Sequence, residues 1–330
     1  MKSGFVAILG RPNVGKSSIM NYMVGEKVAI VSDKAQTTRA RALGVCNRDG
    51  AQIVFVDTPG IHRPRTKLGE FMMKSVDDAK EGVDAIMVVV DAGFIGRGDA
   101  EVMQSIEREK CPKFLVINKT DSVTPEQLMP KLAELNVGMF DKVISVSARK
   151  GTNMDKLTEL LLKVLPEGPA YFPEDMITDQ PERVLCAEII REKALNNLRD
   201  EIPHGIGVEM MSIKKLSANL TEIHATVYCE RAAHKSVIIG KQGTMLQRIG
   251  TAARLDIEKM LGTKVMLKPW VSPATICRWN SRTRMTTGMV TTTAAAAIAP
   301  VGSSNCEAPV KKARAAGTGR ARSVDVREMP

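Results

Sequence analysis

The sequence predicts an α/β domain with a mostly parallel sheet and helices on both faces, then a smaller α+β domain and a disordered C-terminal tail. Through residue 165, short apolar runs alternate with segments of helical spacing, which is typical of a parallel sheet buried on both faces. A Pro-rich stretch then interrupts this alternation. A different order of helices and strands follows it, and beyond Val271 no apolar periodicity continues.

The first domain combines apolar runs of strand length with segments of helical spacing. The predicted strands are 5–9, 52–56, 85–90, 113–117 and 142–146. The predicted helices are 16–24, 70–81, 99–110, 125–136 and 153–165. One hairpin interrupts the alternation, because residues 42–46 turn back through 47–50 into the second strand. We expect this pair to form an antiparallel edge of the sheet.

The remaining chain divides into a linker, a second domain and a tail. We place the first domain at 1–165 and the linker at 166–181, where the prolines exclude a helix or a central strand. The second domain, 182–271, has the predicted order helix, two strands, helix, Gly-x-x-Gly turn, helix and strand. The first helix is predicted at 183–200, the two strands at 206–214 and 221–229, the helix after the turn at 244–261 and the last strand at 264–271. Residues 272–330 are rich in Thr, Ala, Pro, Ser and Arg, and we predict disorder.

Positive charge is concentrated toward the C-terminus. The formal net charge is +10, of which residues 1–180 contribute 0, residues 181–271 contribute +4 and residues 272–330 contribute +6. A basic excess favours a polyanionic partner. If nucleic acid is bound, its phosphates should therefore contact the C-terminal part.

The cysteines and the N-terminus indicate a soluble, cytoplasmic protein. The six cysteines are scattered without a C-x-x-C pair or a nearby His cluster, which argues against a zinc site or a disulfide framework. The first predicted strand already occupies residues 5–9, where a signal peptide would have its apolar region. The longest clean apolar run, near 85–90, is far too short to span a membrane.

A phosphate-binding motif follows the first predicted strand. Residues 10–17, GRPNVGKS, match G-x-x-x-x-G-K-[ST] directly before a helix pattern. The backbone N–H groups of such a loop wrap the α and β phosphates, helped by the helix N-terminus. Lys16 should neutralise β/γ charge, and the Ser17 hydroxyl should take one position on Mg²⁺. The residues predicted to bind nucleotide here are Gly10, Asn13, Val14, Gly15, Lys16, Ser17 and Ser18.

Two other strand ends carry nucleotide-binding patterns. Asp57-Thr58-Pro59-Gly60 follows the second β run, where Asp57 can hold Mg²⁺ through water and the Gly60 N–H can sense a γ-phosphate. Asn118-Lys119-Thr120-Asp121 ends another strand, and Asp121 can accept hydrogen bonds from guanine N1–H and the exocyclic amine. Adenine offers no such pair of donors, so the pattern predicts GTP rather than ATP.

The last predicted strand of the first domain ends in Ser147-Ala148, which could offer a backbone N–H to the guanine carbonyl. In combination and in this order, the motifs resemble the translation-factor class of GTPases. The resemblance implies that residues 33–39, DKAQTTR, form the mobile first switch, in which one Thr coordinates Mg²⁺ only when the γ-phosphate is present. We prefer Thr38 as this ligand and leave Thr37 open. The predicted catalytic group is Lys16, Thr38, Asp57 and Gly60.

Ile61 affects the expected mechanism. Many small GTPases place a water-orienting glutamine at this point, and an Ile side chain cannot orient water. GTPases with this replacement resemble one another in also having Asn in the phosphate loop, here Asn13, which in some of them helps bind K⁺. The resemblance implies slow intrinsic turnover, stimulation by K⁺ and dependence on a partner.

The second domain carries a Gly-x-x-Gly turn between two helical stretches, and its pattern resembles the KH domain. Two glycines let the backbone of a single strand approach closely, and Lys241 adds charge. Apolar residues should line a groove for about four unstacked bases; we expect Ile239, Leu246 and Ile249 to do so. The predicted RNA-binding residues are Ile239, Gly240, Lys241, Gln242 and Gly243.

The first-switch residues 36–39, QTTR, residues 57–62, DTPGIH, and the C-terminal KH pattern together resemble the Era family of bacterial GTPases across residues 1–271. The resemblance implies a P-loop GTPase domain followed by a type II KH domain, with GTP, GDP and Mg²⁺ as ligands. It implies binding to single-stranded RNA near the 3′ end of small-subunit ribosomal RNA, during assembly of the small ribosomal subunit. GTP would favour the RNA-competent state, and hydrolysis would favour release.

The resemblance also brings peripheral contact with the anionic cytoplasmic face of the membrane, of which residues 1–271 show no sign, and we expect a monomer. The end of the chain departs from the family. Members continue after the last KH strand into a further helix, whereas this chain runs from Trp270-Val271 into Ser272-Pro273 and the tail. This departure puts KH stability and RNA affinity in doubt, but not GTP binding. The tail composition fits a changed reading frame in the gene, which resequencing would test, or a basic arm for RNA or anionic lipid.

Two other functions are compatible with parts of this pattern. A GTPase of tRNA modification shares the GTPase motifs and the hydrophobic replacement, but it lacks a KH domain and has a different N-terminal extension. A passive RNA-binding protein with a vestigial GTPase is disfavoured by intact Lys16, Ser17, Asp57 and Asp121. Loss of function in Lys16→Ala would separate the switch from the passive binder.

Overall fold

The computed structural model of the 330-residue chain describes residues 1–34, 37–38, 41–48, 50–60, 79, 82–133, 135–198 and 205–273. Several expectations lie outside the described residues: the helix at 70–81, most of the tail, and the residues Gln36, Arg39, Ile61 and His62. Among the helices of the described ranges, none has the length and apolar character needed to cross a bilayer.

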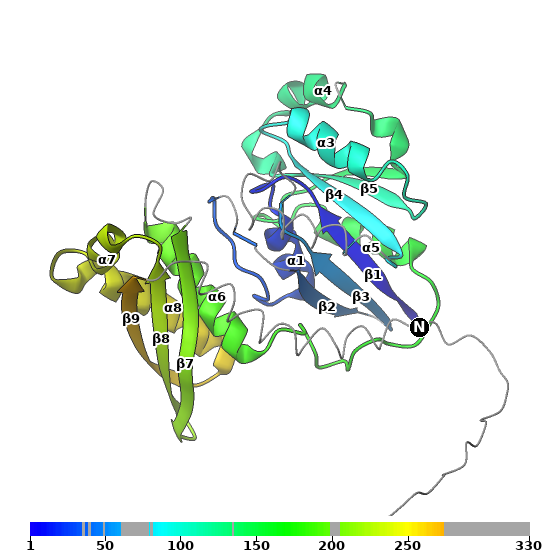
Figure 1. Cartoon of the computed structure of the whole chain (residues 1–330). Helices are drawn as coiled ribbons and strands as arrows, with labels where there is room; N and C mark the ends of the chain where they lie inside the picture. The colour runs from blue at the N-terminus through cyan, green and yellow to red at the C-terminus, as the bar shows by residue number, and fades with distance from the viewer. Residues whose placement is uncertain are drawn as a thin grey trace, which may run out of the picture. The chain divides into compact units, whose positions relative to one another are not determined.

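The first sheet has the strand order β2-β3-β1-β4-β5-β6 (Figure 1). All neighbouring strands are parallel except β2 and β3, so the predicted antiparallel edge is confirmed. The hairpin is tighter than expected, because Arg48 still pairs with Ala51. The strands are β1 (Lys2–Leu9), β2 (Ala42–Arg48), β3 (Ala51–Asp57), β4 (Ala85–Asp91), β5 (Lys113–Asn118) and β6 (Lys142–Ser145).

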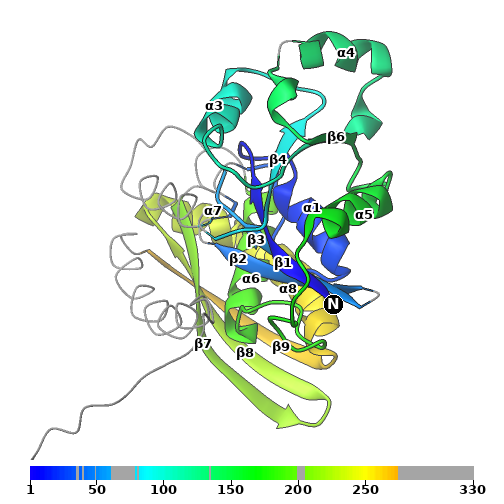
Figure 2. The ribbon, with the colours of Figure 1, turned by 90° about the vertical axis from the view of Figure 1, so that its right-hand side faces the viewer.

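Helices cover both faces of this sheet, as Figures 1 and 2 show. Helices α1 and α5 contribute to the core on one face, and α3 and α4 to the core on the other. Their bounds are α1 (Lys16–Val24), α3 (Arg97–Ser105), α4 (Pro125–Ala133) and α5 (Met154–Val164). Helix α3 ends at Ser105, whereas the sequence predicted its end at residue 110. The buried Ile106 leaves helical geometry, and its N–H donates to the Met103 carbonyl.

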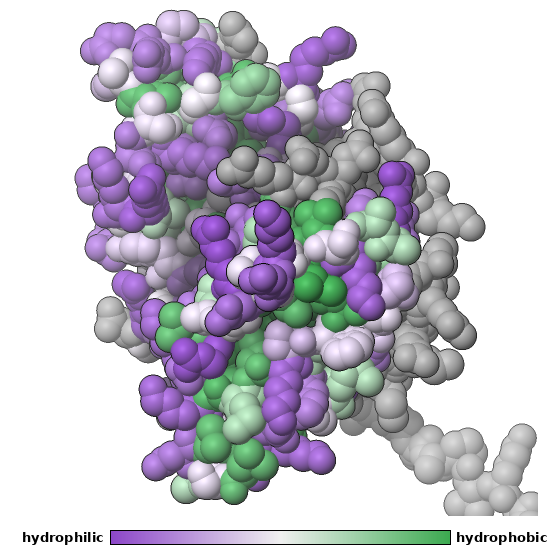
Figure 3. Space-filling view, turned by 90° about the vertical axis from the view of Figure 1, so that its left-hand side faces the viewer, coloured by the Kyte–Doolittle hydropathy of each residue, from purple (hydrophilic) through white to green (hydrophobic). Residues whose placement is uncertain are grey.

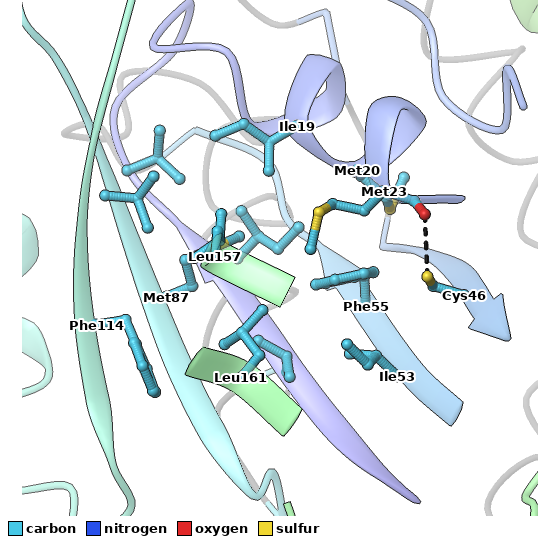
Figure 4. Packing of buried hydrophobic residues seen from close by; sticks show 14 of the residues in the cluster. Ile19, Met20, Met23, Cys46, Ile53, Phe55, Met87, Phe114, Leu157 and Leu161 are labelled. Carbon is cyan, nitrogen blue, oxygen red and sulfur yellow. Dashed lines mark hydrogen bonds between the residues drawn. The ribbon is translucent and has the colours of Figure 1, made fainter. Parts of the chain in front are cut away.

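Alternate residues of the central strands enter opposite cores. Val6 and Ile8 of β1 belong to the core beneath α1 and α5, whereas Ala7 and Leu9 belong to the core beneath α3. Burial on both faces explains why these strands are continuous apolar runs. Figure 4 shows the first core, in which the Cys46 thiol donates to the Met23 carbonyl oxygen at 3.0 Å.

The predicted linker is bound along the edge of the first sheet. The wholly buried Gln52 of β3 accepts the backbone N–H groups of Tyr171 and Phe172 at 2.8 and 3.0 Å, and donates to the Phe172 carbonyl at 2.8 Å. Val45 of β2 donates its N–H to Ile177 at 2.8 Å. Prolines exclude a regular element here, so side-chain and single backbone bonds hold the segment instead.

The second sheet has the strand order β7-β8-β9, with an antiparallel first pair and a parallel second pair. The predicted order of helices and strands is confirmed. The elements are α6 (Glu182–Asn197), β7 (Ile206–Ser217), β8 (Leu220–Cys229), α7 (Ala232–Ile239), α8 (Thr244–Leu261) and β9 (Lys264–Pro273). Among the described residues, the buried core of this domain runs from Cys186 to Val271.

Candidate functional site

The phosphate loop runs from the end of β1 into α1, as the motif predicts. Lys16 is only 6% exposed, and its Nζ donates to the carbonyl oxygens of Gly10 and Arg11 at 3.0 and 2.9 Å. Burial lowers the pKa of Lys16 to about 8, and the nearby Asp57 carboxylate opposes that shift. The pocket beside the loop is lined by Pro12, Asn13, Gly15, Lys16, Ser17, Ser18, Ile30, Val31, Ser32, Asp33, Thr37, Thr38, Gly60 and Lys119.

Three side chains predicted to hold magnesium meet at this pocket. The Ser17 hydroxyl donates to Asp57 Oδ2 at 2.6 Å and lies 3.1 Å from the Thr38 hydroxyl. The neighbouring Thr37 hydroxyl instead donates to the Lys34 carbonyl oxygen at 2.5 Å. The fold therefore brings Thr38, and not the Thr37 hydroxyl, to Ser17 and Asp57.

The donor set at Asp57 fits a magnesium ion. Among the residues that the structure describes, the buried Asp57 Oδ1 has no hydrogen-bond partner. Burial raises the pKa of Asp57, and the charge of Lys16 opposes this rise. A buried carboxylate oxygen without a partner is costly, and carboxylate and hydroxyl oxygens are ligands that Mg²⁺ prefers. The residues present thus suit the cation that the motifs predict.

At the base-binding end of the site, Asp121 Oδ1 accepts a hydrogen bond from Ser147 Oγ at 2.6 Å. This bond lowers the pKa of Asp121, which keeps the carboxylate charged. Asn118 joins two loops, because its Nδ2 donates to the Val14 carbonyl at 3.0 Å and its Oδ1 accepts the Ala148 N–H at 3.1 Å. The pair Ser147-Ala148 was expected to offer a backbone N–H to guanine, and in this structure the Ala148 N–H donates to Asn118.

Lys119 and Asn13 connect the base-binding strand end to the phosphate loop. Lys119 Nζ donates to the Asn13 carbonyl at 2.7 Å and pairs with Asp91 Oδ2 at 2.8 Å. Asn13 has a left-handed backbone, φ 65°, and its side-chain amide donates to the Asp33 carbonyl. All the nucleotide-site residues predicted from the motifs therefore lie in one connected region of the first domain.

In the second domain, the Gly-x-x-Gly turn joins α7 to α8. Gly240 and Gly243 have φ values of 76° and 81°, which favour glycine. A Cβ on Gly240 would lie 2.7 Å from the Met245 Cβ, whereas a Cβ on Gly243 would meet nothing within 4 Å. Lys241 and Gln242 between them are both exposed, so the turn is presented at the surface.

A groove of about 360 Å³ extends from this turn between α8 and β9, and its lining residues are Gly243, Leu246, Gln247, Gly250, Thr251, Arg254, Leu267 and Pro269. Leu246 lines the groove as predicted, but the prediction that Ile249 also lines it is wrong. Ile249 is 1% exposed and lies in the core, because Ile249, Ala253 and Ile257 recur at four-residue spacing on the buried face of α8. Ile239 packs against the same core. Figure 3 shows one face of the molecule, where hydrophobic groups lie among hydrophilic ones.

Comparisons with known proteins find relatives of both domains. Residues 5–119 match the family described as "50S ribosome-binding GTPase", and residues 201–272 match the one described as "KH domain". GTPase Era of Alkaliphilus metalliredigens (strain QYMF) is 51% identical over 274 residues, which cover 82% of this chain and 92% of that relative. The chain belongs to the Era family of GTPases.

Two solved Era structures resemble this Era-family chain over most of its length. One is Era in complex with MgGDPNP and nucleotides 1506–1542 of 16S ribosomal RNA, and it is 42% identical with a TM-score of 0.79. It covers 83% of this chain and 94% of its own. The other is an Aquifex aeolicus Era variant bound to GDP·AlF4⁻, also 42% identical with a TM-score of 0.79, covering 83% of this chain and 95% of its own.

The motif pattern missed one charged contact of the phosphate loop. Arg11 occupies a position where the motif accepts any residue, so the pattern assigns it no role. In the structure its Nε donates to Asp99 Oδ1 at 2.7 Å, although the two residues are 88 positions apart. Only the presence of a charge at a variable loop position could have drawn attention to Arg11.

Proposed function

We propose that this Era-family chain is a GTP-hydrolysing switch that binds single-stranded RNA near the 3′ end of small-subunit ribosomal RNA and acts in assembly of the small ribosomal subunit. One observation carries the proposal. The same chain holds a pocket in which the first-switch Thr38 lies 3.1 Å from Ser17 Oγ, and a KH domain with a groove beside its Gly-x-x-Gly turn. The first is a nucleotide sensor, and the second is an RNA-binding output.

The nucleotide site assigns a task to each group. The loop N–H groups and Lys16 bind the phosphates, while Asp121 accepts the guanine donors and is oriented by Ser147. Ser17, Thr38 and Asp57 would hold Mg²⁺, which supplies charge stabilisation for phosphoryl transfer. We place the γ-phosphate sensor at the Gly60 N–H, because Gly60 lines the same pocket as the phosphate loop.

Switching follows from the position of Thr38. Its hydroxyl reaches the Ser17 and Asp57 side chains from the segment between α1 and β2, which must be ordered for this contact to form. A γ-phosphate would favour that arrangement, and its release would remove the stabilisation. Asn13, which lines the same pocket, is the proposed K⁺ ligand, and K⁺ would supply positive charge at the transferred phosphate.

The RNA output is assigned to the turn at 240–243 and the groove beside it. The exposed backbone of the turn allows a sugar-phosphate chain to approach closely, and Lys241 supplies positive charge. Polar side chains in the groove, Gln247, Thr251 and Arg254, are suited to hydrogen-bond base edges, while Leu246 offers an apolar surface. The expected ligand is a short unpaired strand rather than a duplex.

We propose the domain boundaries 1–165, 166–181 and 182–271, with residues 166–181 bound to the first domain through Gln52 and Val45. The two sheets support this division, because each has a core of its own. We further propose a cytoplasmic monomer whose contact with anionic membrane is peripheral.

The RNA assignment is tested by adding charge to the turn of the full-length chain. Gly243→Asp should lower affinity for a 3′-terminal small-subunit rRNA oligonucleotide by at least about tenfold, which is about 1.4 kcal/mol, because it places a carboxylate beside a phosphate. Gly243 is the better site, since a side chain has room there and collides at Gly240. Fluorescence anisotropy with labelled RNA measures the affinity.

Gly243→Asn is the matched control. It has the same size and the same backbone demand as Asp, tolerates positive φ and adds no charge, so it should retain most of the RNA affinity. GTP turnover in KCl, with and without the oligonucleotide, then reports whether RNA binding is coupled to the switch. Equal RNA affinity in the Asp and Asn variants would remove the turn from the RNA site.

A further inference from the structure

A charged contact lies beside the phosphate loop, outside the residues assigned to phosphate or magnesium. The Arg11 guanidinium donates from Nε to Asp99 Oδ1 and from Nη2 to the Phe94 carbonyl oxygen, both at 2.7 Å. It also lies 4.9 Å from the centroid of the Phe94 ring. The second residue of the loop is thus bound by the segment that leads from β4 into α3.

The surroundings of Asp99 suit it to pair with the Arg11 guanidinium. Its side chain is 1% exposed in the first turn of α3, and its second oxygen, Oδ2, accepts the Gly96 N–H at 2.9 Å. A carboxylate this deeply buried is stable when it is paired and hydrogen-bonded. The Arg11 stem is also closely packed, since a Cβ on Gly98 would lie 2.5 Å from its Cδ.

The next residue of the loop, Pro12, contacts Gly60. A Cβ on Gly60 would lie 2.5 Å from the Pro12 nitrogen and 2.7 Å from the Pro12 Cα, so the two backbones are in direct contact. Pro12 follows Arg11 immediately, and its ring restricts the backbone between them. The residue that contacts Gly60 is therefore the direct chain neighbour of the residue bound to Asp99.

We propose that Arg11 is a positioning residue for GTP hydrolysis: its pair with Asp99 fixes the phosphate loop on α3 at the spacing from Gly60 that the γ-phosphate requires. Arg11 does not itself contact the nucleotide pocket, whose lining includes Pro12 and Asn13. The effect should therefore fall on the triphosphate and on hydrolysis more than on GDP. This inference rests on the proposed GTP switch.

The test uses the full-length chain with Arg11→Ala, Arg11→Lys and Asp99→Asn. Arg11→Ala should lower kcat by about 10- to 100-fold, because small misplacements of reacting groups cost this much. Its affinity for a non-hydrolysable GTP analogue should fall about tenfold relative to its affinity for GDP. Arg11→Lys should restore part of the kcat and part of the analogue affinity. Lysine keeps the charge but lacks the planar guanidinium whose Nε and Nη2 donate separately to Asp99 and to the Phe94 carbonyl.

Asp99→Asn should reproduce the Arg11→Ala defect, and the double variant should be no worse than Arg11→Ala alone. The matched control is Arg97→Ala, which removes an exposed arginine from the same helical turn and should leave both quantities unchanged. Thermal unfolding is measured in parallel. The proposal would be overturned if Arg11→Ala lowered the melting temperature but left kcat and the ratio of analogue affinity to GDP affinity unchanged. Additive effects of the two substitutions in the double variant would also overturn it. Absent turnover in the unmodified chain would instead reject the GTP switch, while the affinity ratio would still report on Arg11.

Discussion

At the scale of single residues, the chemistry of the site depends on a few oxygen atoms whose neighbours orient them. Ser147 holds the Asp121 carboxylate at 2.6 Å, and Ser17 holds the Asp57 carboxylate at the same distance. In each case a hydroxyl from another element fixes one carboxylate oxygen. The other oxygen can then serve the ligand, the base for Asp121 and the cation for Asp57.

Base selection should reverse with one atom change at Asp121. Asp121→Asn replaces an acceptor by an amide that can donate, so affinity for GTP should fall by at least about 100-fold while affinity for xanthosine triphosphate rises. Isothermal titration calorimetry measures the affinity for each of the two nucleotides. Asp155→Asn, an exposed change on α5, should leave GTP affinity as it was. Loss of both affinities together would indicate a folding defect and not base recognition.

The two switch threonines should behave differently. Thr38→Ala removes a hydroxyl beside Ser17 and should reduce hydrolysis about 100-fold while sparing GDP affinity. Thr37→Ala removes a hydroxyl that bonds the Lys34 carbonyl and should keep turnover within a few-fold of the original. Magnesium titration of GTP hydrolysis distinguishes them. A larger defect in Thr37→Ala would reverse the assignment.

At the scale of elements, the Pro-rich segment shows how an irregular stretch is held. Its residues have no ladder of their own, and the buried amide of Gln52 satisfies two backbone N–H groups and one carbonyl. One side chain of β3 therefore makes three of the bonds that attach the segment to the first domain. Composition correctly excluded a helix and a central strand but gave no sign of this attachment.

Loss of the Gln52 amide should weaken that attachment. Gln52→Leu leaves the Tyr171 and Phe172 backbone groups without their partner, so the free energy of unfolding should drop by about 2 kcal/mol. Chymotrypsin should also cleave faster after Tyr171, whereas Pro173 blocks cleavage after Phe172. Urea unfolding and a timed digest measure the two effects. Gln104→Leu, an exposed change on α3, provides the comparison, and equal digestion of both variants would contradict the role of Gln52.

At the scale of the whole molecule, one chain combines a nucleotide site with a KH domain whose core, among the described residues, runs from Cys186 to Val271. The absence of the family's closing helix made KH stability doubtful from sequence. In the described residues, α6, α7 and α8 already supply the helices that cover the three-stranded sheet. Within the described residues, this domain therefore has a buried core of its own.

Monovalent cations should control the turnover of the full-length chain. If Asn13 helps bind K⁺, hydrolysis should be at least about tenfold faster in KCl than in NaCl at equal ionic strength, because a fixed cation stabilises charge in the transition state. A phosphate-release assay in the two salts measures this ratio. Asn13→Ala should abolish the difference without affecting KH binding to RNA. Equal rates in the two salts would reject K⁺ as an activator.

The sequence by itself determined the order of the elements, the phosphate loop, the base-specifying strand end and the KH turn. These features are local: a strand, a tight turn and a helix N-terminus place their residues in known positions once the motif is present. The choice of GTP over ATP follows from the type of side chain at position 121 and needs no tertiary contact.

Only the tertiary structure brought the Thr38 hydroxyl, and not that of Thr37, to Ser17. It also placed Ile249 in the core, attached the linker to Gln52 and paired Arg11 with Asp99. Each of these depends on which face a residue presents, or on two segments far apart in the chain meeting at one sheet edge. A local pattern carries residue type and spacing. It does not carry the strand order and the packing of helices that bring residue 11 to residue 99.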